Sequence, residues 1–468
     1  VTARTGIKVL AGGINAVGVV TATSFIGSGA SLSGIEAAPT FQATASGSIA
    51  NGKTIVLNTD ATVSAAATTL VSESVGSVVE ISSPAGGTRM LSSTWMSDTK
   101  VIVAWALAND PKYVYMAVGT VSGTSITYGT AVQVGGTGLR GYFGSIIWDA
   151  SVNAGAIFVA DMWNAVSKYF GFTVSGTTIS LRAVSSSGYY LDSNNPSSLR
   201  AVGNGNGGFA IVYNQTGTLK SRVGTLNSSA DISVGGNSNT YGGQWTGQYQ
   251  YAQSICDIAY VPDRSTATTS TYGVSTIDGT TGLRCMIISG ATGTSHTLNT
   301  NFVTQLVTID NSMAASLTYN TEFNCFYMVY RAGSTTYSRT WEVNTAGTGV
   351  QDIASLSVIP NNNSSYACIV EYSPTTKKAY ISLTTQQRMR AVEVSFASNS
   401  SITVGTLTNI TATGTESERF TMAANNTVGK IFAAASDTSS PFYGDSHIWQ
   451  TEMITTNVTA NNFLGFSA

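Results

Sequence analysis

The sequence predicts an all-β protein, a seven-bladed β-propeller of four-stranded antiparallel blades preceded by a Gly/Ser/Thr-rich, fibre-like stem. Three observations support this prediction. Charged residues make up only 10% of the chain, 48 of its 468 residues are Gly, and 43% are hydrophobic, which leaves enough apolar surface for a core. An apolar run recurs seven times, and turn-forming residues flank each copy. Abundant Thr, Val, Tyr and Gly with few charges is typical of strands joined by tight turns.

The recurring run is the strongest evidence for a repeat fold, because its copies are spaced by 52 to 63 residues. The copies are KVIVAWAL (100–107), GAIFVAD (155–161), GGFAIVY (207–213), STYGVSTID (270–278), CFYMVYR (325–331), KAYISLT (378–384) and KIFAAAS (430–436). One strand-like segment precedes each copy and two follow it. In the segment 118–136, for example, a Ser-Gly turn joins the third strand of a unit to the fourth. Units of this length with four short strands predict propeller blades.

The ring must also close, and the sequence offers a closing strand. GSVVEI (76–81) aligns with GTAVQV (129–134), which is the outer strand of the first unit. We therefore expect residues 75–82 to complete the last blade, which hides sheet edges that otherwise pair with other chains. Two other folds stay open at this point. A β-solenoid would have shorter and more uniform repeats, and a string of β-sandwiches would need longer linkers.

Outside the repeats, the chain divides into three further segments. Residues 1–40 read as a stem and oligomerisation segment, because such Gly-rich β segments need partner chains to cover their apolar face, and we expect a homotrimer. Residues 41–70 read as a connecting β-hairpin that turns at Asn51-Gly52. The propeller then spans 71–455, and 456–468 reads as an exit segment leading to a further domain.

Composition argues against several classes of function. The net charge of −2 does not favour nucleic acid as a partner. The sequence has no run of eighteen apolar residues, so it does not predict a membrane-spanning helix. The four cysteines lie inside apolar runs, so we expect buried free thiols. Their spacing predicts no metal site, and no cofactor motif is present.

Catalytic and ion-binding patterns are also weak. A Ser-His-Asp triad would need His296 or His447, which read as solvated or structural side chains. GNGNGG (203–208) lacks the helix and the Lys of a phosphate loop and reads as a turn between strands. LDSNNP (191–196) and VNTAGTGVQD (343–352) do not match a calcium loop. We nominate no catalytic residue and no metal ligand.

Four segments carry a resemblance to a known group of proteins. They are GVVTATSFIGSGASLSGI (18–35), ATASGSIANGKTIVLNTDATVS (43–64), VGTVSGTSITYGTAVQV (118–134) and NVTANNFLGFSA (457–468). These segments resemble parts of the tail-fibre-like structural proteins of marine tailed phages, notably cyanophages. The resemblance implies a virion location, contacts with other virion proteins and attachment to a host. It brings no catalytic residues with it.

Aromatic residues gather in the segments that should share one face of the propeller. The connections between blades and the turns between second and third strands emerge on the same face, so these side chains should meet on one rim. The candidate residues are Trp163, Tyr189, Tyr190, Asp192, Trp245, Gln248, Tyr249 and Tyr251. Flat aromatic rings beside amides and carboxylates suit a sugar, whose C–H faces stack and whose hydroxyls form hydrogen bonds. The alternative is that these rings pack the loops against the propeller or a partner chain.

Taken together, these features predict a non-enzymatic virion protein, a tail fibre or appendage that attaches to a host-surface glycan or receptor. A first alternative is a purely architectural fibre whose propeller docks to other virion proteins. A second is a glycan-degrading enzyme, which would need a pair of carboxylates that the sequence alone does not identify.

Overall fold

The computed structural model describes residues 44–49, 54–66, 68–81, 88–107, 112–136, 139–161, 164–182, 188–192, 196–215, 217–235, 239–241, 256–266, 268–278, 282–305, 315–332, 335–344, 349–353, 357–358, 368–385, 388–411, 420–425, 427–436, 444–456 and 463–466. In these residues the regular structure is almost entirely β, with a short 3-10 turn at Pro262–Arg264. The chain forms two compact units, 1–68 with 456–468, and 69–455. The predicted stem, 1–40, lies outside the described residues.

The smaller unit contains one three-stranded antiparallel sheet. Strand β1 (Thr54–Leu57) lies between β2 (Val63–Ala65) and β39 (Phe463–Phe466). The β1–β2 hairpin turns through 58–62, where Asp60 Oδ1 accepts hydrogen bonds from both the amide and the hydroxyl of Thr62. The expected turn at Asn51-Gly52 lies outside the described residues. Residues 463–466 of the expected exit segment are thus part of this sheet. A separate strand pair joins β3 (Thr68–Val71) to β38 (Met453–Thr456).

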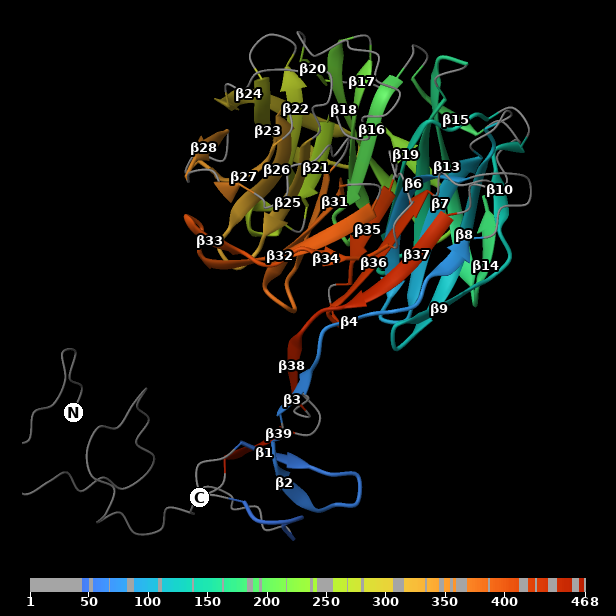
Figure 1. The fold of residues 1–468 in the computed structure, drawn as a ribbon. Coiled ribbons are helices and arrows are strands. Elements are labelled where there is room, and N and C mark those ends of the chain that lie inside the picture. The colour runs from blue at the N-terminus through green and yellow to red at the C-terminus, as the bar shows by residue number, and fades with distance from the viewer. Residues whose placement is uncertain are drawn as a thin grey trace, which may run out of the picture. The chain divides into compact units, whose positions relative to one another are not determined.

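The larger unit is a seven-bladed β-propeller of four-stranded antiparallel meanders, as the sequence predicts (Figure 1). Seven innermost strands contact one another in a ring: β6 (Thr88–Ser97), β11 (Phe143–Asp149), β16 (Pro196–Gly203), β21 (Cys256–Tyr260), β25 (Ala315–Asn320), β30 (Cys368–Ser373) and β35 (Phe420–Ala424). The second strands are β7 (Lys100–Leu107), β12 (Ala154–Asp161), β17 (Gly208–Gln215), β22 (Ser270–Asp278), β26 (Cys325–Ala332), β31 (Lys378–Thr385) and β36 (Lys430–Ser436).

In six of the seven blades the third strand is longer than the second, and the outer strands are mostly broken in two. The third strands are β8 (Val114–Ser122), β13 (Val166–Ser175), β18 (Thr218–Leu226), β23 (Gly282–Thr292), β27 (Thr335–Val343), β32 (Arg388–Ser398) and β37 (Gly444–Gln450). The outer strands are β9 (Ser125–Tyr128) with β10 (Val132–Val134), β14 (Thr178–Leu181) with β15 (Tyr189–Asp192), β19 (Ile232–Val234) with β20 (Asn239–Tyr241), β24 (Ser295–Gln305), β28 (Val350–Asp352) with β29 (Ser357–Val358), β33 (Ser401–Val404) with β34 (Thr408–Asn409), and β4 (Ser74–Val75) with β5 (Val79–Ile81).

The second strands coincide with the seven recurring apolar runs. Their described side chains are almost all buried, because each of these strands has a neighbouring blade on both of its faces. A strand covered on both faces reads as a continuous apolar run rather than as an alternating one. The buried apolar residues of the described chain form seven clusters, and each cluster joins two adjacent blades.

The ring closes through two segments that are far apart in the chain. Strands β4 and β5 pair with β37, so residues near the N-terminal end of the propeller complete its seventh blade. They occupy in that blade the places that β9 and β10 occupy in the first. Side chains reinforce the closure: Ser446 Oγ donates to the carbonyl oxygen of Val79 (2.7 Å), and Trp449 Nε1 donates to Glu73 Oε1 (2.9 Å).

Glycines on the outer strands let adjacent blades approach closely. A Cβ on Gly76 or Gly235 would overlap the carbonyl oxygen of Thr124 or Thr294, which belong to the next blade's turn between third and fourth strands. Thr177 of the second blade meets Gly129 in the same way. In each of these two-residue turns the first residue is a Gly with positive φ, as a type II′ hairpin requires. The Gly-on-turn contact therefore joins blades seven and one, blades one and two, and blades three and four.

Replacing Gly235 by Ala tests the importance of this contact. We expect Gly235→Ala to lower the free energy of unfolding by about 1–3 kcal/mol, because overpacking forces the two blades apart. Gly203→Ala is the matched control in the same blade, since its Cβ would find no atom closer than 3.8 Å. It should be neutral or slightly stabilising. Urea titration of both variants makes the comparison, and equal stabilities would contradict the proposed steric role of Gly235.

Candidate functional site

The candidate site lies at the outer edge between blades two and three. In the described chain, large apolar side chains are strongly exposed at four positions, and two of these are Tyr189 (42%) and Tyr190 (63%) of β15. Each ring packs on its cross-strand neighbour in β13. Tyr189 stacks on Tyr169 with centroids 5.2 Å apart, and Lys168 Nζ lies 5.2 Å from the centroid of Tyr190. Successive residues of a strand point to opposite faces, so the two tyrosines do not form one continuous platform.

Asp192, the third predicted residue on β15, has an internal role in the structure. Its Oδ2 accepts hydrogen bonds from the Tyr213 hydroxyl (2.9 Å) and from Lys220 Nζ (3.0 Å). Its Oδ1 accepts one from Gln215 Nε2 (3.1 Å). All three donors belong to blade three. Burial raises the pKa of the Tyr213 hydroxyl, which therefore stays a protonated donor. The carboxylate thus anchors the end of β15 to the next blade.

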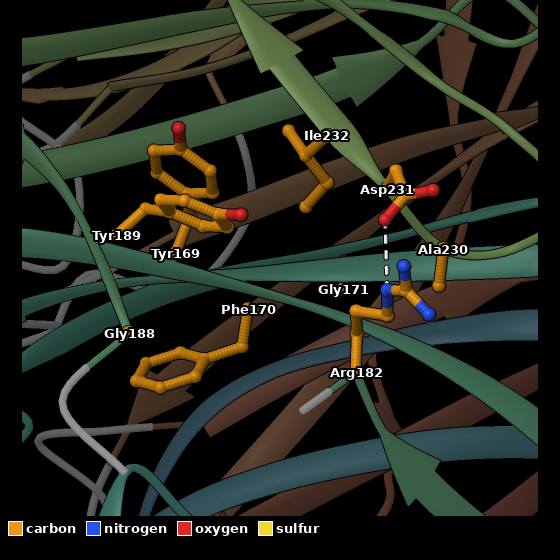
Figure 2. A pocket seen from close by; sticks show the side chains of 9 residues that line it. All are labelled: Tyr169, Phe170, Gly171, Arg182, Gly188, Tyr189, Ala230, Asp231 and Ile232. Carbon is orange, nitrogen blue, oxygen red and sulfur yellow. Dashed lines mark hydrogen bonds and ion pairs between the residues drawn. The ribbon is translucent and has the colours of Figure 1, made fainter. Parts of the chain in front are cut away.

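A small depression adjoins Tyr189 (Figure 2). Its lining comes from both blades: Tyr169, Phe170, Gly171, Arg182, Gly188, Tyr189, Ala230, Asp231 and Ile232. Arg182 Nε donates to Asp231 Oδ1 at 2.7 Å, and the two side chains are 48% and 45% exposed. The depression therefore has an aromatic wall from Tyr169 and Tyr189 and a salt-bridged polar wall.

The turn that carries Asp231 is longer than its counterparts in blades one, two and four. Asn227 organises it, because Asn227 Oδ1 accepts hydrogen bonds from the amides of Ser229 and Asp231, both at 2.9 Å. Ala230 has a φ of +59°, which a non-Gly residue adopts uncommonly. The carbonyl oxygen of Ala230 lies against Gly171 of β13, where a Cβ would overlap it, so only a Gly fits there.

Arg182 takes the place of a Gly in this contact. The amides of Gly129 and Gly235 donate to the third-strand carbonyls of Val118 and Val223. Arg182 lies midway between these two glycines in the sequence, and its amide donates to the carbonyl of Gly171 at 2.8 Å. Blade two thus moves the required Gly onto its third strand and places a cation on its edge. Sequence reasoning missed Arg182 and Asp231, although the equal spacing of the three positions was a usable signal.

The structure places three of the eight predicted site residues. Tyr189, Tyr190 and Asp192 come together on β15, with Tyr189 alone lining the depression. Trp163, Trp245, Gln248, Tyr249 and Tyr251 lie outside the described residues.

A second group of polar side chains lies on the innermost strands. Asp257 Oδ2 accepts hydrogen bonds from Ser316 Oγ (2.7 Å) and from the amide of Leu317 (2.9 Å). Arg200 Nε lies 3.9 Å from Asp257 Oδ1. Glu371, from blade six, interacts electrostatically with both of these groups. Burial, and then the charge of Asp257, raise the pKa of Glu371 to about 8. In the described part of the chain, no group of three metal-ligating acidic, His or Cys side chains is present.

The histidines and cysteines have structural positions. His296 Nε2 lies 2.9 Å from Ser221 Oγ of the preceding blade, and His447 Nδ1 lies 3.2 Å from the Gly76 carbonyl oxygen at the ring closure. Burial lowers the pKa of both imidazoles. The four cysteines are buried and form no disulfide, and burial raises the pKa of each thiol. A search of the described residues for a helix long and apolar enough to cross a membrane finds none.

Comparisons with known proteins find similar solved structures only at low sequence identity. No family model matches the sequence, and no curated protein matches it. Among solved structures, a protein from Lactobacillus plantarum is 9% identical, with 79% of this chain and 98% of that chain covered and a TM-score of 0.48. The β-propeller domain of the Trilobed protease from Pyrococcus furiosus is 7% identical (82% and 99% covered, TM-score 0.39). The Dos1 propeller is 9% identical (81% and 95% covered, TM-score 0.43).

The raised pKa of Glu371 predicts a pH-dependent stability. A carboxyl group whose pKa is higher in the folded than in the unfolded state stabilises the fold below its unfolded pKa, near 4.5, and this contribution is lost as pH rises through about 8. Glu371→Gln keeps the neutral shape and removes the titration. We expect the variant to exceed the parent in free energy of unfolding at pH 9, by roughly a few kcal/mol, and to match it near pH 5.

Denaturant titrations at several pH values make this measurement. Glu342→Gln is the control, because Glu342 lies on a third strand and not with Asp257 and Glu371 on the innermost strands. A constant difference between the parent and Glu371→Gln across this pH range would contradict the raised pKa.

Proposed function

We propose that this chain is a virion structural protein of a phage, a tail fibre or appendage, whose propeller attaches to a glycan on the host surface without cleaving it. The virion assignment rests on the resemblance of the four segments described above. The binding assignment rests on the edge between blades two and three. There an exposed tyrosine borders a depression, at a blade contact that departs from the Gly-on-turn arrangement.

This edge has the chemical character of a sugar-binding surface. Tyr169 supports one face of the Tyr189 ring, so the ring is held in place before any ligand arrives. A fixed aromatic ring offers a flat apolar surface to the C–H face of a pyranose at little entropic cost. The hydrogen-bonding side chains of Arg182 and Asp231 line the same depression and suit the hydroxyls that surround such a face.

Weak single sites would suffice for attachment if the protein is the trimer that we propose. Linked copies raise the effective concentration of the second and third binding events, so the avidity exceeds the affinity of one site by orders of magnitude. Such a protein needs no deep pocket.

The architectural alternative uses the same exposed surface. Tyrosine is enriched at protein–protein interfaces, so Tyr189 and Tyr190 also suit contacts with another virion protein. In that case the rings would be covered in the assembled particle and would take no part in retention on cells.

Retention on host cells separates these two functions. The labelled full chain is incubated with candidate host cells and with their extracted envelope polysaccharides, and bound protein and newly released reducing ends are measured together. We expect saturable retention without sugar release, and a loss of at least tenfold in apparent affinity for Tyr189→Ala.

The matched control is Tyr337→Ala. Tyr337 also stacks on a neighbouring tyrosine, Tyr330, at 5.5 Å, but it lies in blade five. Its removal should leave retention unchanged. Equal losses in the two variants, or no retention on any host that the particle adsorbs to, would overturn the attachment function, and sugar release would indicate an enzyme instead.

A further inference from the structure

We infer that the depression between blades two and three recognises an acidic sugar, a pyranose that carries a carboxylate, with Tyr189 stacking on the ring and Arg182 binding the carboxylate. This inference rests on the proposed glycan attachment and specifies the class of sugar that the same site selects.

Arg182 has hydrogen-bonding capacity left for a ligand. Its Nε is bonded to Asp231, and its two terminal nitrogens make no hydrogen bond with any described residue. The side chain is about half exposed. A guanidinium group presents its donors in a rigid fork that matches the two oxygens of a carboxylate, and this geometry distinguishes it from a lysine.

The protein holds this guanidinium group in position before a ligand binds. Asp231 fixes the Nε edge of the Arg182 guanidinium group. Asn227 in turn holds Asp231: its Oδ1 accepts from the Asp231 amide, and its Nδ2 donates to Asp231 Oδ2 at 3.3 Å. Because the Nε edge is occupied, an anion meets the terminal nitrogens. A donor group that is already oriented loses less side-chain entropy on binding than a free surface arginine.

The aromatic and cationic groups suit different parts of one sugar residue. Tyr189 and Arg182 line the same small depression, together with the apolar side chains of Phe170 and Ile232 (Figure 2). In a hexuronate, the carboxylate is attached to the pyranose ring itself, next to its C–H face. A single residue can therefore stack on the tyrosine while its carboxylate reaches the arginine. A neutral hexose offers the same stacking face and hydroxyls but no carboxylate for the arginine.

The departure from the repeated blade contact supports the same inference. Between blades seven and one, blades one and two, and blades three and four, the next blade's turn packs against an uncharged outer-strand Gly. Blade two carries Arg182 at this position, and the opposing turn is longer and carries Asp231. An exposed ion pair of this kind contributes little to stability, so stability alone gives a weak reason for it.

The test compares two oligosaccharides that differ only in the acidic group. Trigalacturonate and the corresponding neutral galactotriose are titrated into the full chain by isothermal calorimetry at low and at physiological salt. We expect trigalacturonate to bind at least tenfold more tightly than galactotriose, with an affinity that falls as salt is added. Arg182→Gln should weaken trigalacturonate binding at least tenfold and so remove its preference over galactotriose.

Arg264→Gln is the matched control. Arg264 is also exposed (43%) and its Nε also faces an aspartate, Asp263 at 3.5 Å, but it lies in blade four away from the depression. It should bind both sugars as the parent does. An unchanged preference in Arg182→Gln, or equal affinities of the parent for the two sugars, would overturn the inference.

The same titrations keep this inference distinct from the proposed function. If the parent binds both sugars equally and Tyr189→Ala weakens both, the site binds glycans without selecting acidic ones, so the inference fails and the attachment function stands. If neither sugar binds but cells retain the protein through Tyr189, acidic-sugar recognition is wrong as stated. If cells do not retain the protein either, the proposed function fails as well.

Discussion

The propeller depends on hydrogen bonds that backbone amides of one innermost strand donate to side chains of the preceding innermost strand. Among the described strands, neighbouring blades share no backbone ladder, so the inner edges of the sheets need other partners. Ser92 and Ser145 accept hydrogen bonds from the amides of Ile146 and Ala201 in the following blades, at 3.1 and 3.0 Å. Ser316 does the same for Val370 at 3.1 Å. Where Asp257 takes this position, its carboxylate accepts the corresponding bond from Leu317. At these four junctions, short polar side chains thus take the place of the missing backbone pairing.

This arrangement explains which parts of the fold the sequence predicts well. The second strands are buried on both faces, so their apolar runs stand out and recur with the blade period. Outer strands are half exposed and break in the middle, as between β9 and β10, and their composition resembles that of the turns. The hairpin turn at 58–62 contains no Asn-Gly pair and is held by the hydrogen bonds of Asp60, so the Asn-Gly signal does not indicate it.

The candidate site was harder to predict for a different physical reason. Exposed aromatics can be found in loops from composition, and Tyr189 was found in that way. Which face of the strand each ring takes depends on register, and a shift of one residue reverses it. Asp192 has the residue type of a sugar ligand, but three donors from blade three surround it, and those contacts follow from tertiary packing. Arg182 and Asp231 are 49 residues apart and meet only because consecutive blades are adjacent.

A repeat fold makes departures from its own pattern informative. The Gly-on-turn contact has a steric cause, since a Cβ would overlap the next blade's turn. Replacing that Gly by Arg182 is tolerated because Gly171 restores the missing space from the adjacent strand, where the carbonyl of Ala230 arrives. Two coupled changes occur here: the Gly is displaced to the third strand, and the opposing turn is longer. The two blades still pack together through Gly171 and Ala230, and the Arg182–Asp231 ion pair lies beside Tyr189 at the surface. The rigid ring supplies the fixed geometry, so chemistry can vary at its edge without loss of the fold.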